Sequence, residues 1–453
     1  MTTMTDIRRH ALGLAIAIAL PLSASADVLS RSAAAGPDTT WTPASGVDAL
    51  DSLKKYYEIP DFRIGGTYDL DADPETWRNG GEGGTTLESL GSRPLRTAYI
   101  DVGTPIRNES GEIINAVIVS PYYSGDATAM YGYWFPGTGN GLAAGPVTGP
   151  GLVIDTDKYY VVFLDSLGLW GASKPSEGLG RDFPQYSYFD MVQANYQLLR
   201  DHLNVGNVHL ATGASMGATQ TWVWGAMYSQ NGFVDAIMPI GGATASDGDD
   251  PVGQWTFRLG QAAIESDPVY RETGGMYYDL PKTEQPLRGL QFMWSQLQLT
   301  GFAFEFRSAQ PWSSVETEVF YWEPEGDQTA AFIARTLRED PNDFWYRNAS
   351  GFTYNINDRL GTITARTLVV HVENDKWLMV ENARNAAAAV EGAGFLTFSD
   401  PTAHYGVFKA PNVLSAQVKS FVDDTNIPGS MAGGTGGGGA GGAAPEKPSG
   451  FSK

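Results

Sequence analysis

The chain has 453 residues, of which 42% are hydrophobic and 12% aromatic, so it can bury a large core and is not a disordered protein. Its formal net charge of −21 argues against nucleic acids and anionic membranes as partners, since both repel a polyanion. The absence of cysteine excludes thiol nucleophiles and thiolate metal sites.

Residues 1–26 have the pattern of a secretory signal peptide. Arg8 and Arg9 precede a short apolar run, residues 12–22, which is too short to span a membrane. Ala24-Ser25-Ala26 then fits an A-x-A cleavage site. We therefore expect an exported protein, periplasmic or extracellular, without an integral membrane span. The paired arginines leave the Sec and twin-arginine routes open, and an uncleaved anchor is the alternative.

The two ends of the remaining chain have few signals for regular structure. Residues 27–60 are mixed and polar, and we expect an N-terminal extension there. Residues 424–453 contain a Gly-rich stretch that cannot bury enough apolar area to order itself, so we expect a flexible tail.

The first part of the core is expected at 61–244. Strand patterns at 97–102 and 113–119 indicate an opening pair separated by a turn at 108–111. Among these strand signals, a short apolar run at 130–135 ends in Pro136-Gly137-Thr138-Gly139. The elements that follow have clearer patterns: a strand buried on both faces at 159–164, a helix at 188–203, a strand at 208–212, a helix at 216–229 and a strand at 236–239.

The second part of the core is expected at 361–423. It contains a strand at 367–372, a helix at 380–390, a strand at 395–398 and a last helix at 413–422. Alternating strands and helices predict an α/β protein with a mostly parallel sheet flanked by helices. The stretch between the two parts, 245–360, is helical in part and rich in aromatic residues, and we expect it to form a cap over the sheet's C-terminal edge.

Residues 213–217, Gly-Ala-Ser-Met-Gly, match the G-x-S-x-G pattern of a nucleophile elbow. A predicted strand precedes the motif and a predicted helix follows it, which is the context that the motif requires. Glycines on both sides of Ser215 allow a tight turn that presents the serine hydroxyl, and the N–H of Met216 can bind an oxyanion. An ordinary strand–helix turn is the alternative interpretation.

The general base must come from five histidines. His10 lies in the signal, His202 lies near a helix end, and His209 and His371 lie in apolar strand runs typical of the core. His404 lies in a loop just after the last predicted strand, at the sheet edge that should carry the serine. The order Ser, acid, His is that of α/β hydrolases, so His404 is the predicted base and a surface histidine is the alternative.

The acid should follow strand 367–372, where Asp375 is the first choice and Glu373 the reserve, because strand alternation places both on one side. The carboxylate would hold the imidazole in the required tautomer. We expect the second oxyanion donor in the loop after 130–135, at Gly137 or else Thr138, although a plain glycine turn would look the same.

These and other motifs resemble the homoserine O-acetyltransferases and their esterase relatives, and the resemblance covers residues 96–422. It is carried by matches at 149–151, 154–159, 165–168, 173–176, 183–184, 190–192 and 215–217, and in the cap at 263–264, 267–268, 274–275 and 289–290. The resemblance implies the α/β-hydrolase fold, a triad of Ser215, Asp375 and His404, and Gly137 as the second oxyanion donor.

The sequence departs from this family where the transferases hold homoserine. Counted from Gly289-Leu290, the family's arginine position falls on Trp294 and its tyrosine position on Gly301; its aspartate position after the histidine falls on Tyr405. An arginine-to-tryptophan change replaces a carboxylate clamp by an apolar wall. We expect Trp294 and Tyr405 to line the substrate pocket, with core packing as the alternative for Trp294.

An exported enzyme does not meet acetyl-CoA, so water is the expected acyl acceptor and a carboxylesterase the expected activity. We expect a small-molecule ester as substrate and no cofactor, and the histidine spacing offers no metal site. The alternatives are an acyltransferase with another donor or acceptor, a non-catalytic binding protein on this scaffold, and a peptidase or lactone hydrolase. The substrate and the oligomeric state stay open.

Overall fold

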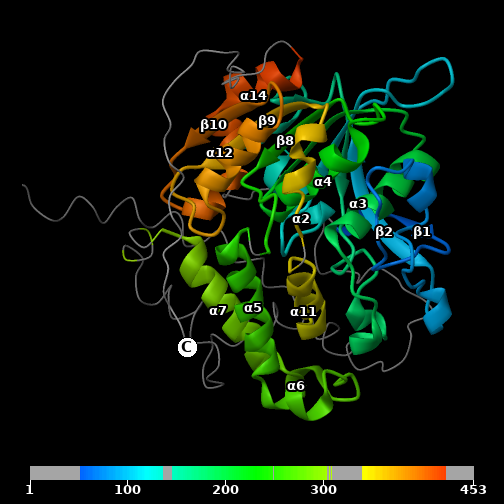
Figure 1. Ribbon diagram of the computed structural model, residues 1–453, viewed down its shortest axis with the longest axis vertical. Coiled ribbons are helices and arrows are strands. Elements are labelled where there is room, and N and C mark those ends of the chain that lie inside the picture. The colour runs from blue at the N-terminus through cyan, green and yellow to red at the C-terminus, as the bar shows by residue number, and fades with distance from the viewer. Residues whose placement is uncertain are drawn as a thin grey trace, which may run out of the picture.

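The computed structural model describes residues 51–135, 145–247, 249–303, 306, 308, 339–352 and 354–424. The expected signal peptide, residues 27–50 of the expected N-terminal extension and residues 425–453 of the expected Gly-rich tail lie outside these ranges. The described residues form an α/β-hydrolase fold, with one eight-stranded sheet between two layers of helices (Figure 1).

The sheet has the strand order β1-β2-β6-β3-β7-β8-β9-β10. Strands β1 (Lys55–Ile59) and β2 (Leu95–Val102) are antiparallel to each other, and β2 is antiparallel to β6 (Tyr160–Leu164). From β6 onward the strands are parallel: β3 (Ala116–Ser120), β7 (Val208–Ala214), β8 (Ala236–Ile240), β9 (Arg366–Val372) and β10 (Gly394–Phe398). Their carboxyl ends therefore meet at one edge of the sheet.

The central strands β3, β6 and β8 are buried at every position, and their residues are apolar except for Ser120 at the end of β3. On β6, Val162 faces one core and Val161 the other. The first core is closed by α3 (Tyr188–Gln197), α4 (Met216–Tyr228) and α12 (Val380–Ala389), and the second by α2 (Ala127–Trp134), α13 (Ala410–Val413) and α14 (Ser415–Val422). This two-sided burial explains the continuous apolar runs of the sequence.

Helices between β8 and β9 lie together at one end of the molecule, beneath the sheet in Figure 1. They are α5 (Pro251–Glu265), α6 (Pro268–Thr273), α7 (Leu287–Gly301) and α11 (Pro341–Ala349). Helices α5, α6 and α11 each begin with an aspartate cap followed by proline, which fixes their first turn. Ile264, Leu290, Met293 and Phe344 form a separate apolar core among them. We still propose 245–360 as the extent of the cap.

The structure confirms most of the elements expected from the sequence and corrects four of them. Strand β1 lies in the expected extension, where its five residues are too short a pattern to stand out. The strand expected at 113–119 begins only at Ala116, and β6 separates it from β2, so the two do not pair. Residues 130–135 lie mostly in α2, whose first turn is capped by Asp126. The last helix is interrupted at Leu414, after Pro411 in α13.

Candidate active site

Ser215 lies at the sharp turn between β7 and α4. Its backbone has φ 58° and ψ −122°, a conformation that a residue with a side chain rarely adopts. A Cβ on Gly217 would lie 2.3 Å from the carbonyl oxygen of Ser120, and a Cβ on Gly213 would lie 2.6 Å from the carbonyl carbon of Gly217. The glycines of the motif are therefore required by backbone packing, and the turn leaves the Ser215 side chain partly exposed.

Ser215, His404 and Asp375 form one hydrogen-bonded chain at the carboxyl edge of the sheet. His404 Nε2 lies 2.7 Å from Ser215 Oγ, and His404 Nδ1 lies 2.6 Å from Asp375 Oδ2. A carboxylate can only accept, so Nδ1 carries the proton and donates to Asp375, which leaves Nε2 to accept from the serine hydroxyl. His404 lies in a 3-10 helix, Ala403–Phe408, that follows β10.

Asp375 is buried, and its surroundings favour the charged carboxylate. Burial alone would raise its pKa, but the charge and hydrogen bond of His404 and the N–H of Leu378 outweigh this effect, so the pKa lies below its ordinary value. The N–H groups of Trp377 and Leu378 donate to Oδ1 at 2.8 and 3.1 Å. Glu373, the second candidate for the acid, is exposed, and His404 contacts Asp375 in its place.

The other described histidines have structural partners. His371 is buried, contacts the carbonyl oxygen of Leu378 at 2.7 Å, and its pKa is lowered by burial. His209 contacts the carbonyl oxygen of Val422 at 2.7 Å and stacks on Tyr159. His202 lies 3.1 Å from the hydroxyl of Tyr99. His404 is thus the one described histidine that contacts Ser215.

Met216 begins α4 directly after the serine, so its N–H stands at the helix start beside the Ser215 side chain. The predicted second donor, Gly137, and its reserve Thr138 lie outside the described residues. The loop beside the elbow is a different one, residues 121–126 between β3 and α2. β3 pairs with β7 up to Gly213, and Gln220 of α4 donates to the carbonyl oxygen of Pro121.

Tyr123 of this loop was not among the sequence-based candidates. In α/β hydrolases the second oxyanion N–H comes from the loop after the strand next to the nucleophile strand, and here that loop follows β3. The sequence does predict the strand that precedes this loop, at 113–119. Its position beside β7 depends on the strand order of the sheet, which a hydrophobic pattern does not reveal. The Tyr123 hydroxyl donates to Asn348 Oδ1 of α11 at 2.8 Å, so the loop also contacts the cap helices.

The two predicted pocket residues, Trp294 and Tyr405, lie on the side of the site that faces the helices between β8 and β9. Trp294 of α7 packs edge-on against Tyr123 and Phe344, and its indole N–H donates to Glu339 at 2.6 Å. Tyr405 is adjacent to His404 and stacks on Phe302, with ring centroids 4.1 Å apart. Both are partly buried.

The position expected to carry the family's tyrosine, Gly301, has no room for a side chain. A Cβ there would lie 2.7 Å from the Trp377 ring and 2.8 Å from the Tyr405 ring. The absence of a side chain at 301 and the presence of an aromatic ring at 405 therefore belong to one packed arrangement.

Across the described ranges, no three His, Asp or Glu side chains gather in a way that could hold a metal ion. None of the helices in these ranges has the length and apolar character needed to cross a membrane.

Relatives in sequence are acyltransferases and esterases. The chain is 26% identical over 311 residues to a probable acyltransferase of Methanothermobacter thermautotrophicus, covering 68% of this chain and 86% of that protein. It is 31% identical over 214 residues to the homoserine O-acetyltransferase of Carboxydothermus hydrogenoformans, covering 44% and 50%. A probable esterase of Corynebacterium glutamicum is 23% identical over 336 residues, covering 71% and 87%. No family model matches the chain.

Solved structures share the fold. An acetylester hydrolase from Corynebacterium glutamicum superposes with a TM-score of 0.63 at 19% identity, covering 84% of this chain and 99% of the other. A homoserine O-acetyltransferase from Bacillus anthracis gives 0.62 at 17% identity, covering 83% and 99%. Both enzyme classes therefore have the same architecture, and the choice between them depends on the site.

Proposed function

We propose that this chain, whose relatives in sequence include homoserine O-acetyltransferases and esterases, is a serine carboxylesterase of the α/β-hydrolase fold. The observation that carries the proposal is the hydrogen-bonded chain from Ser215 Oγ through His404 to Asp375, with its 2.7 and 2.6 Å contacts. This is the arrangement in which an imidazole can remove a hydroxyl proton as the oxygen attacks a carbonyl.

In the first half of the reaction, Ser215 Oγ attacks the ester carbonyl carbon while its proton passes to His404 Nε2. Asp375 stabilises the imidazolium. The carbonyl oxygen becomes an oxyanion, bound by the N–H of Met216 and, we propose, of Tyr123. The bond between the carbonyl carbon and the alcohol oxygen then breaks, and His404 gives its proton to the leaving alcohol, which leaves an acyl group on Ser215.

In the second half, water replaces the alcohol. His404 takes a proton from water, the oxygen attacks the acyl carbon, and the proton returns to Ser215 Oγ as the acid leaves. The three positions that the resemblance assigns to homoserine binding are Trp294, Gly301 and Tyr405, and none of these side chains can form an ion pair with a homoserine head group. The Trp294 indole N–H is itself engaged by Glu339. The predicted export of the chain supports the same choice of acceptor, and we propose that the enzyme acts outside the cytosol.

The test is a panel of p-nitrophenyl esters of increasing acyl length, measured with the wild type and with Ser215→Ala. The proposal predicts hydrolysis by the wild type and none above background by the variant. Wild-type turnover by Ser215→Ala would refute the mechanism.

Acyl transfer to an acceptor other than homoserine is the second candidate, because relatives include acyltransferases. It predicts that an added alcohol accelerates release of p-nitrophenol and receives the acyl group as a new ester. Hydrolysis with water as acceptor predicts that free acid remains the main product when alcohol is added.

A further inference from the structure

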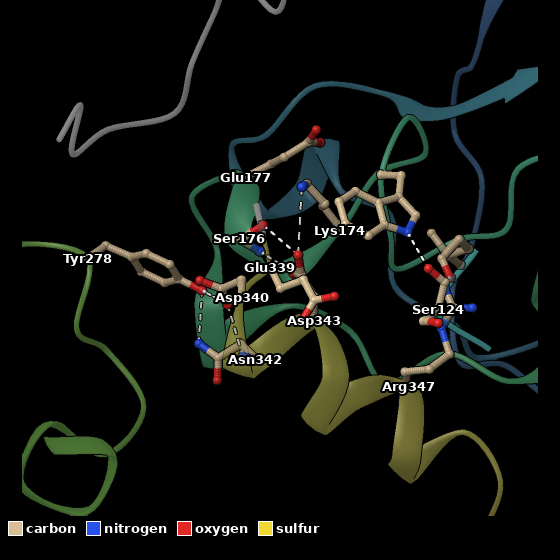
Figure 2. A network of polar contacts seen from close by, with 12 residues as sticks. Ser124, Lys174, Ser176, Glu177, Tyr278, Glu339, Asp340, Asn342, Asp343 and Arg347 are labelled. Carbon is tan, nitrogen blue, oxygen red and sulfur yellow. Dashed lines mark hydrogen bonds and ion pairs between the residues drawn. The ribbon is translucent and has the colours of Figure 1, made fainter. Parts of the chain in front are cut away.

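Arg347 of α11 is a fully buried cation beside the nucleophile elbow. Its guanidinium Nη1 lies 3.4 Å from Met216 Sδ and 3.5 Å from the carbonyl oxygen of Tyr123. Its Nη2 lies 3.1 Å from the carbonyl oxygen of Leu167 and 3.4 Å from that of Ser166, just after β6. In Figure 2, Arg347 extends toward Ser124, in the same loop as Tyr123.

Among the residues that the structure describes, the charge of this guanidinium has no acidic partner. Within the described part of the chain, no carboxylate lies within ion-pair distance of it, and its Nε–H has no hydrogen-bond acceptor. Asp343, one turn earlier on α11, points instead to the 173–177 segment (Figure 2), where the N–H and hydroxyl of Ser176 donate to it and Lys174 lies at 3.7 Å.

A buried cation without a countercharge is costly, and an apolar side chain of similar volume could fill the same space. The contacts of Arg347 indicate a role for this cation beside the nucleophile elbow. Two of the four groups that it holds belong to Met216 and Tyr123, whose N–H groups form the proposed oxyanion hole. Arg is suited to this task because its rigid fork addresses several acceptors at once.

We propose that Arg347 is a positioning residue for the oxyanion hole: its guanidinium, carried by a cap helix, fixes Tyr123 and Met216 relative to each other. This inference rests on the proposed function. Displacement of one donor misaligns the hole with the position that the oxyanion reaches only in the transition state. The loss should therefore appear in kcat rather than in KM.

The experiment compares the wild type, Arg347→Met, Arg347→Lys and Arg366→Met. Met keeps the volume of the stem, whereas Lys also keeps the charge and loses the fork. Arg366 is the matched control, since it also bonds a backbone carbonyl, that of Phe421, but lies at the start of β9, the strand end away from Ser215. Active sites are counted by organophosphate labelling of Ser215, so a smaller folded fraction does not count as a slower enzyme. The readouts are kcat, KM and the affinity of a trifluoromethyl ketone, which forms an oxyanion on the serine.

We expect kcat per labelled site to fall about 10-fold to 100-fold in Arg347→Met, with KM within about twofold. Affinity for the trifluoromethyl ketone should fall in parallel, Arg347→Lys should not recover it, and Arg366→Met should stay within about twofold of the wild type. Wild-type kcat and ketone affinity in the Arg347 variants would overturn the positioning role while leaving the esterase proposal intact. If Arg347→Met does not fold, Arg347→Lys decides alone by the same criteria. A wild type that neither hydrolyses esters nor reacts with the organophosphate would refute both proposals.

Discussion

The indole of Trp377 lies against the imidazole of His404, with ring centroids 4.8 Å apart and an angle of 48° between the rings. The backbone N–H of Trp377 donates to Asp375 Oδ1 at 2.8 Å, and its indole N–H donates to Thr300 Oγ1 of α7 at 2.6 Å. One residue thus contacts the predicted acid, the predicted base and a helix of the cap region.

Trp377→Phe keeps an aromatic ring against His404 and removes the donor to Thr300. We expect the free energy of unfolding to fall by about 0.5–1 kcal/mol, the usual worth of a single hydrogen bond. Thr300→Val should cost a similar amount, and the double variant should cost little more than either single one. Denaturant titration of the three variants measures this coupling, and strictly additive losses would show that the bond contributes nothing.

The two acidic candidates after β9 should differ sharply. Asp375→Asn removes the carboxylate that holds His404, so the wrong imidazole tautomer becomes favoured and kcat should fall about 10³-fold to 10⁴-fold. Glu373→Gln, two positions away and exposed, is the matched control and should stay within about twofold of the wild type. Steady-state kinetics on one p-nitrophenyl ester decides between them, and the reverse ranking would place the acid at Glu373.

A methyl group at position 217 should disrupt the elbow. The Cβ of Gly217→Ala would lie 2.3 Å from the Ser120 carbonyl oxygen, so the backbone must shift, which should destabilise the fold by about 1–3 kcal/mol and move the serine. In Gly361→Ala the nearest atom is the Ala389 carbonyl oxygen at 3.9 Å, and no comparable loss is expected. Melting temperature and kcat per labelled site are the readouts. Equal behaviour of the two variants would contradict the packing described for the elbow.

Asp343 predicts a pH dependence of stability. Burial raises the pKa of this carboxyl well above its ordinary value, and Lys174 and Ser176 offset the effect only in part. Between the unfolded and folded pKa values the unfolded chain has released a proton that the folded chain retains. Stability attributable to Asp343 is therefore present at acid pH and is lost as pH rises above about 4 toward the folded value.

Asp343→Asn removes this titration. Burial raises the pKa of Asp343 to about 7, so relative to the wild type the variant should become more stable as pH rises from about 4 to about 7, and the difference should level off above that. The total change should be ~1.4 kcal/mol for each unit by which the folded pKa exceeds the unfolded pKa. Denaturant titrations of both proteins at several pH values measure the difference. A stability difference that is constant with pH, or one that moves in the opposite direction, would show that the Asp343 carboxyl is not raised.

The parts of the fold that the sequence predicted are those with local signals. Apolar runs identified β6, β7 and β9, and the G-x-S-x-G motif identified the elbow, because each pattern is set by burial or by a turn within a few residues. The chain order of Ser215, Asp375 and His404 then followed from where parallel strands end. Strand alternation alone could not distinguish Asp375 from Glu373 as the acid. The structure distinguishes them, because Asp375 is buried against His404 and Glu373 is exposed.

The features that the sequence did not predict depend on contacts between segments far apart in the chain. The place of β3 between β6 and β7, and so the role proposed for Tyr123, follows from hydrogen bonding between strands far apart in the chain. Arg347 gave no signal, since a charged residue in a helix is ordinarily exposed. Its burial beside Met216 follows only from the docking of α11 on the carboxyl edge of the sheet.

The most direct test of the proposed acyl-enzyme is the mass of the protein quenched shortly after mixing with p-nitrophenyl acetate. Attack by Ser215 predicts the added mass of one acetyl group, located on the peptide that contains Ser215, and no such addition in Ser215→Ala. An acetyl group that is found on another residue, or that persists at the same level in Ser215→Ala, would contradict it.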